Sequence, residues 1–121
     1  MNEGKNIVKD KSFAFALRVV KLFQFLCNKK QEYIMSKQLM RSGTAVGALV
    51  REAEHAESKA DFIHKMAIAQ KEANESAYWL ELLHQSHYLT DAEFNSIISD
   101  QQEIGKLLSS IILTSKARKQ S

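Results

Sequence analysis

The chain has 121 residues, and they include no proline, one cysteine and four glycines. A fold with many turns or strands usually places proline in some of its turns, so the absence of proline favours helices. The single Cys27 excludes an internal disulfide framework, and its apolar neighbours indicate a buried small hydrophobe. No apolar run reaches the roughly 20 residues of a membrane span, and the polar segment 1–12 does not resemble a signal peptide. We therefore expect a cytoplasmic protein without membrane contact.

The composition predicts one globular domain over residues 1–121. Hydrophobic residues make up 45% of the chain and charged residues 26%, which is ordinary for a protein with a single packed core. The net charge of +3 is unevenly distributed, because residues 1–41 carry +6, residues 42–103 carry −7 and residues 104–121 carry +4. The chain therefore has basic ends and an acidic middle.

Apolar residues at three- and four-residue spacing predict four helices, at about 11–27, 31–56, 58–87 and 91–116. Asp10 or Ser12 is the candidate cap of the first helix, and residues 28–30 are the candidate first turn. Ser58 is expected to cap the third helix, and Thr90 with Glu93 forms a capping-box pattern before the fourth. Short turns make consecutive helices antiparallel neighbours, so the sequence predicts an all-α, up-down-up-down four-helix bundle.

Small residues recur at four-residue spacing in the second and third predicted helices. A glycine inside a helix costs about 1 kcal/mol relative to alanine, so two of them need a structural reason. When the register is set from the turn near Ser58, Gly43 faces Ala73 and Gly47 faces Ala69. We therefore expect these four residues to bring the second and third helices unusually close together.

The first predicted helix is apolar over a wider arc than one bundle core can cover. Two stripes share this arc. One contains Phe13, Ala16, Leu17, Val20 and Phe23, and the other contains Phe15, Val19, Leu22, Phe25 and Leu26. We expect the second stripe, with Phe15, Val19, Leu22 and Leu26, to form an interface between copies of the chain. The alternative is a helix that sinks deeply into its own core.

No catalytic site, metal site or cofactor is predicted. Glu52 with His55 and Glu81 with His84 form two Glu-x-x-His pairs, which in some helical bundles build a di-metal site. The two pairs are roughly 39 Å apart along the axis at 1.5 Å per residue, so they cannot share a metal in one subunit. His84 and His87 lack an evident third ligand. The sequence also lacks a phosphate-binding loop and a dinucleotide-binding glycine motif. We therefore expect a protein that is not an enzyme.

Basic residues are the main functional signal. Those near the termini meet at one end of an antiparallel bundle, and others follow the first two helices. A ring of subunits would repeat these charges on one surface, which strengthens phosphate binding. The alternative is that they complement helix ends and keep the protein soluble. The candidate nucleic-acid-binding residues are Lys9, Lys11, Arg18, Lys21, Lys37, Arg41, Lys116, Arg118 and Lys119.

The segment from Gln38 to Leu83 contains several family-like motifs. They are Gln38-Leu39-x-Arg41-Ser42, the small residues through Gly47, Arg51-Glu52-Ala53, Lys59-x-x-Phe62-Ile63, Ala67-x-Ala69, and Glu72 and Glu75 before Leu80. On these motifs the segment resembles the four-helix-bundle family of 23S rRNA intervening-sequence proteins. Many relatives carry an Asn-Ile-Ala-Glu-Gly-like run at the end of the second helix, whereas residues 48–53 of this chain lack that Asn and Gly.

This resemblance implies a bundle that assembles into a ring, with pentamers as the known example. A related accessory protein of diversity-generating retroelements forms a basic pentameric barrel that engages nucleic acid and a reverse transcriptase. From the resemblance and the basic residues together we expect a homo-oligomer that binds RNA or DNA, with a reverse transcriptase or another protein as a further partner. The alternative function is a protein-interaction scaffold that binds no nucleic acid.

Overall fold

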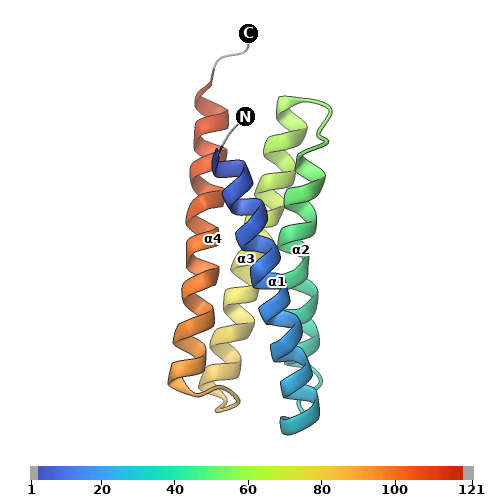
Figure 1. The fold of residues 1–121 in the computed structure, drawn as a ribbon, viewed down its shortest axis with the longest axis vertical. Coiled ribbons are helices and arrows are strands. Elements are labelled where there is room, and N and C mark those ends of the chain that lie inside the picture. The colour runs from blue at the N-terminus through green and yellow to red at the C-terminus, as the bar shows by residue number, and fades with distance from the viewer. Residues whose placement is uncertain (1–2, 119–121) are drawn as a thin grey trace.

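Four long helices run antiparallel in the computed structural model, which describes residues 3–118 (Figure 1). They are α1 (Glu3–Lys30), α2 (Met35–Ala53), α3 (Lys59–Gln85) and α4 (Asp91–Ala117). The α2–α3 turn lies at the same end of the bundle as the start of α1 and the end of α4, and the other two turns lie at the opposite end. We call these the terminal end and the loop end. The predicted all-α antiparallel bundle is confirmed.

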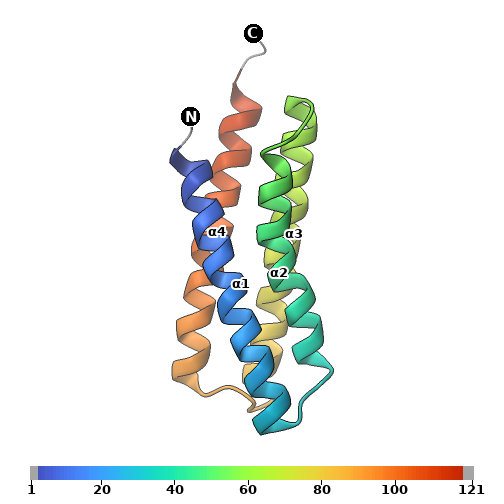
Figure 2. The same cartoon turned by 45° about the vertical axis from the view of Figure 1, so that its right-hand side comes forward.

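Each helix packs against two neighbours, so the four form a closed square. The neighbouring pairs are α1 with α2, α2 with α3, α3 with α4 and α4 with α1 (Figure 2). Among the described residues no helix is long and apolar enough to cross a membrane. The core between the helices contains Val8, Phe15, Val19, Leu26, Leu39, Val46, Met66, Leu80, Leu83, Ile104 and Leu108.

Two of the predicted helix caps are confirmed. The Ser58 hydroxyl accepts a hydrogen bond from the Asp61 backbone N–H at 3.0 Å. Thr90 and Glu93 exchange both hydrogen bonds of a capping box. The predicted start of the first helix is wrong, because α1 begins at Glu3 and already includes Asp10 and Ser12. Its end is also later than predicted, so the first turn lies at residues 31–34 instead of 28–30.

Glu32 in this first turn caps α2, a role that the sequence analysis did not assign. Its carboxylate accepts hydrogen bonds from the backbone N–H groups of Ile34 (3.1 Å), Met35 (3.0 Å) and Ser36 (2.7 Å). Glu32 is only 7% exposed. Burial by itself would raise the pKa of Glu32, but the hydrogen bonds from these N–H groups outweigh it and lower the pKa below its ordinary value. The charged carboxylate therefore stabilises the start of α2.

The two glycines of α2 face α1, so the predicted partner helix is wrong. A Cβ at Gly43 would lie 2.8 Å from a methyl carbon of Val19, and a Cβ at Gly47 would lie 3.4 Å from the carbonyl oxygen of Ser12. Both contacts are with α1, whereas Ala69 and Ala73 belong to α3. The idea of close packing holds, but the turn near Ser58 could not reveal which of its two neighbours α2 approaches more closely.

The apolar stripe of α1 that was expected at an interface lies in the subunit's own core. Phe15, Val19 and Leu26 are completely buried in the subunit's own core, and Leu22 packs against that core. These side chains therefore cannot form the predicted interface between copies. Phe13 and Leu17 of the other stripe are 48% and 50% exposed. They share the outer arc of α1 with charged residues such as Asp10 and Lys21, which must stay in contact with water.

Candidate nucleic-acid interface

Ion pairs engage several of the bases that the sequence analysis assigned to nucleic acid. Lys9 Nζ lies 3.3 Å from a carboxylate oxygen of Glu54, and Lys11 Nζ lies 3.2 Å from one of Glu103. All four side chains remain more than one-third exposed, so these pairs contribute little stability. Lys9 and Lys11 do lie toward the terminal end, but a phosphate would have to compete with an acid at each position.

Arg18 bridges α1 and α4. Its guanidinium donates to the carboxylate of Asp100 at 2.6 Å and to the hydroxyl and carbonyl oxygens of Ser96. These contacts account for the position of Arg18 through the fold alone. A phosphate that bound Arg18 would have to displace Asp100.

Arg41 belongs to a network across α2 and α3. It donates to Glu72 at 3.1 Å and to Glu75 at 2.6 Å, and the indole N–H of Trp79 also donates to Glu75, at 3.0 Å. The hydrogen bonds from Trp79 and Arg41 lower the pKa of Glu75. The hydrogen bond to Glu75 in turn raises the pKa of Arg41. Arg41 is therefore committed to a structural role.

Four of the remaining predicted bases lie within the described residues and are free of ion pairs. Lys21, Lys37, Lys116 and Arg118 have no carboxylate oxygen within 4.0 Å in the described part of the chain. Lys119 lies outside the described residues. The structure thus separates the predicted set into bases held by acids and bases open to a ligand.

The free charges on the described surface are mostly positive. Most acids are engaged by bases, by helix caps or by His84, which leaves Asp10, Glu57 and Glu81 without such a partner. The bases without an ion pair among residues 6–118 are Lys21, Lys29, Lys30, Lys37, Arg51, Lys59, Lys71, Lys106, Lys116 and Arg118.

At the terminal end, Lys59 adds a base that the sequence analysis did not include. It begins α3, and its ammonium donates to the carbonyl oxygen of Arg118. This bond ties the start of α3 to the end of α4, so Lys59 lies with Lys116 and Arg118 at one end although it is distant from them in sequence. The sequence analysis assigned only bases near the chain termini to this end and omitted Lys59, which follows the α2–α3 turn at the same end.

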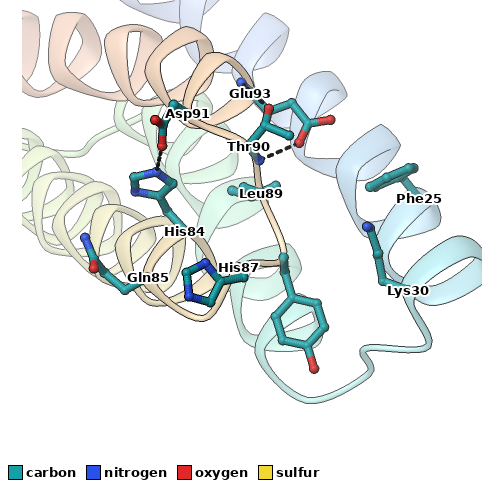
Figure 3. A pocket seen from close by; sticks show the side chains of 10 residues that line it. Phe25, Lys30, His84, Gln85, His87, Leu89, Thr90, Asp91 and Glu93 are labelled. Carbon is teal, nitrogen blue, oxygen red and sulfur yellow. Dashed lines mark hydrogen bonds and ion pairs between the residues drawn. The ribbon is translucent and has the colours of Figure 1, made fainter.

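A hollow of about 550 Å³ lies at the loop end, between the end of α1 and the α3–α4 turn (Figure 3). Phe25 and Lys30 line one side, and His84, Asp91 and Glu93 are among the residues across from them. His84 Nε2 lies 2.7 Å from an oxygen of Asp91. Because the lining sets the carboxylates of Asp91 and Glu93 against the single lysine Lys30, the hollow lacks the excess of positive charge that phosphate binding requires.

The histidines of the predicted Glu-x-x-His pairs lie at opposite ends of the bundle. His55 is at the terminal end next to the α2–α3 turn, and His84 is at the loop end, where its ring stacks on Phe94 with centroids 4.3 Å apart. Within the described residues, no three His, Cys, Asp or Glu side chains are placed to hold one metal ion.

The comparison with known proteins matches this fold over nearly its whole length. The model of the 23S rRNA-intervening sequence protein family matches residues 4–110. The chain belongs to this family. A crystal structure of a protein of unknown function from the S23 ribosomal protein family of Bacteroides thetaiotaomicron is 57% identical and superimposes with a TM-score of 0.89. The similarity covers 90% of this chain and 97% of that one.

No curated protein matches the chain. The 23S rRNA-intervening sequence protein family thus accounts for the four-helix architecture and the residues that carry the resemblance. The solved relative is described as having unknown function, so an activity must be argued from the residues of this chain.

Proposed function

We propose that this member of the 23S rRNA-intervening sequence protein family is a non-enzymatic homo-oligomer that binds RNA or DNA. The observation that carries the proposal is the excess of unpaired bases over unpaired acids on the described surface. Nucleic acid offers closely spaced phosphates, and each phosphate that a base neutralises releases counterions and adds affinity.

The terminal end is the best-supported binding surface of one subunit. Lys59, Lys116 and Arg118 gather there, and Glu57 is the free acid nearest to Lys59 in sequence. Three contacts on one subunit give weak binding, but a ring would place the same group several times along one strand of nucleic acid. After the first subunit binds, the other subunits of the ring bind the same strand at a high effective concentration, so several weak contacts add up to stronger binding. A pentamer is the ring size that the family resemblance implies.

Salt-dependent binding tests this function directly. We expect the wild-type protein to bind a fluorescent single-stranded RNA at low salt, with an affinity that falls steeply as salt rises. Replacing Lys116, Arg118 and Lys119 together by Ala should weaken binding and flatten the salt dependence. Arg41→Gln is the matched control, since Glu72 and Glu75 already occupy the Arg41 guanidinium. Unchanged binding by the triple variant would move the site away from the terminal end.

A protein-interaction scaffold is the second candidate, and the face of α3 supports it. Tyr78 is 57% exposed and meets Trp79 edge-on, with ring centroids 4.9 Å apart. Trp79 is held by Glu75, which also holds Arg41. Tyr, Trp and Arg are the residue types that most often dominate protein–protein binding. If the wild-type protein shows no RNA or DNA binding even at low salt, this scaffold function is favoured.

A further inference from the structure

The outer face of α1 carries an apolar stripe with a charge at each end. Phe13 and Leu17 form the exposed apolar part, and Asp10 and Lys21 flank it at three- and four-residue spacing along the same helix face. Neither Asp10 nor Lys21 has an ion-pair partner within the described part of its own subunit. Arg51 of α2 lies over the Phe13 ring, 4.9 Å from its centroid, and keeps it in place.

A shallow groove between α3 and α4 lies on another side of the bundle. Its volume is about 860 Å³. Its lining contains Ala77, Gly105, Lys106 and Leu113, and the other seven lining residues are Gln, Asn, Ser and Thr. A Cβ at Gly105 would meet no atom of the described residues within 4 Å. Unlike Gly43 and Gly47, this glycine in the interior of α4 therefore has no packing reason within its own subunit, although it costs helix stability.

The free charges around this groove have the opposite order to those on α1. Lys106 lies on its α4 side, and Glu81 continues the α3 row one turn beyond Ala77. Neither side chain has an ion-pair partner in the described part of the subunit. Toward the loop end, the α1 stripe therefore has an acid first, then apolar residues, then a base. In the same direction, the groove has a base first, then small residues, then an acid.

The matching charges also lie at similar heights along the bundle. The ion pair between Lys11 and Glu103 shows that these residues are level, so Asp10 and Lys106 differ by only about two residues, or about 3 Å. Val19 contacts Gly43, and Ser42 hydrogen-bonds to Ser76, so residue 19 is nearly level with residue 76. Lys21 lies two residues and Glu81 five residues beyond that level, toward the loop end, so the two differ by about three residues, or about 4.5 Å. If a ring axis runs parallel to the bundle, neighbouring copies are not shifted along it, so residues at equal heights on two copies can face each other.

From these relationships we infer that the α1 stripe of one subunit docks into the α3–α4 groove of a second copy of this chain. Phe13 and Leu17 enter the groove where Gly105 and Ala77 leave room, and Asp10 and Lys21 pair with Lys106 and Glu81 of the neighbouring copy. Because the two surfaces are different, the contact is head-to-tail and closes into a ring when the rotation permits. This inference rests on the assembly that forms part of the proposed function, and it does not depend on nucleic-acid binding.

Charge exchange tests the pairing of the two surfaces. Asp10→Lys or Lys106→Asp alone places like charges opposite each other in the interface, so the oligomer should dissociate at higher protein concentrations than the wild type. The double variant restores opposite charges and should recover the wild-type dissociation curve, within about threefold, by light scattering on dilution. A double variant no better than either single variant would overturn the assigned pairing.

Mixing two interface variants tests the head-to-tail geometry. Leu17→Glu damages the stripe and leaves the groove intact, and Gly105→Leu fills the groove and leaves the stripe intact. The Leu17 side chain is half exposed and Gly105 faces open space, so each variant should keep the wild-type circular dichroism spectrum. Gln38→Glu adds the same charge at an exposed position of α2 and is the control, which should assemble as the wild type does.

Light scattering should give each interface variant alone a mass near 13.8 kDa. Their equimolar mixture should form a dimer of twice that mass, because one intact stripe meets one intact groove and no third subunit can be added. A Leu17→Glu variant that keeps the wild-type oligomeric mass, or a mixture that stays monomeric, would overturn the inference. A monomeric wild type would instead reject the proposed assembly itself, whereas loss of nucleic-acid binding would leave all of these masses unchanged.

Discussion

Ser42 of α2 and Ser76 of α3 share a hydrogen bond inside the core, with their hydroxyl oxygens 2.9 Å apart. Both residues are completely buried. Ser76 also donates to the carbonyl oxygen of Glu72, and Ser42 lies within hydrogen-bonding distance of the carbonyl oxygen of Leu39. Neither hydroxyl is left without a partner, so two polar side chains join α2 and α3 inside the core.

Removing one of the two hydroxyls should destabilise the protein more than half as much as removing both. Ser76→Ala leaves the buried Ser42 hydroxyl without its cross-helix partner, and we expect a loss of about 1 kcal/mol in the free energy of unfolding. The double variant Ser42→Ala with Ser76→Ala should lose less than the two single variants combined, because it leaves no unpaired group. Urea unfolding of the four proteins provides the cycle. Strict additivity would show that the two hydroxyls are energetically independent.

Enlarging Gly47 should disturb the contact between α1 and α2. The leucine side chain of Gly47→Leu would meet the α1 backbone at Ser12, and backbone atoms cannot move aside as a flexible side chain can. We expect a loss of about 1–3 kcal/mol in the free energy of unfolding. Gly47→Ala is the matched control and should have a much smaller effect, since its Cβ lies 3.4 Å from the nearest atom. Equal effects of Leu and Ala would show that overpacking is not the cause.

Acid should weaken the cap that Glu32 provides. Its pKa is lower in the folded protein than in the unfolded chain, so the stabilisation is complete above the unfolded pKa and is lost as the pH falls through the folded pKa. Glu32→Gln should therefore be less stable than the wild type at pH 7, by about 1 kcal/mol. Thermal unfolding from pH 7 to pH 2 should show this difference shrinking below the ordinary glutamate range. A pH-independent difference would assign the effect to packing instead of charge.

Breaking the Arg41 network should have little effect on stability. The Arg41 side chain is half exposed, so solvent screens its pairs with Glu72 and Glu75. We expect Arg41→Gln to lower the free energy of unfolding by about 0.5 kcal/mol or less, with a smaller difference at 1 M salt. Urea unfolding at low and high salt measures both values. A loss of several kcal/mol would mean that the network does more than hold two surface helices together.

Helix number and type followed from the sequence because they depend on local order. The spacing of apolar residues, the Ser58 cap and the Thr90–Glu93 capping box all act within a few neighbouring positions. The start of α1 was missed because Asp10 and Ser12 look like caps. In the bundle, Ser12 instead donates to the carbonyl oxygen of Lys9 one turn earlier, a bond that an interior helical serine can make.

The partners of each residue were decided only by the tertiary structure. Sequence alone showed that α1 has two apolar stripes, that α2 has two glycines and that the chain ends are basic. Three outcomes depended on how the four helices rotate against one another. They are the stripe of α1 that is buried, the helix that packs against the glycines of α2, and the bases that form ion pairs. Those rotations are set by packing and charge pairing between residues far apart in the chain, such as Gly47 with Ser12 and Arg18 with Asp100. No local pattern records such contacts.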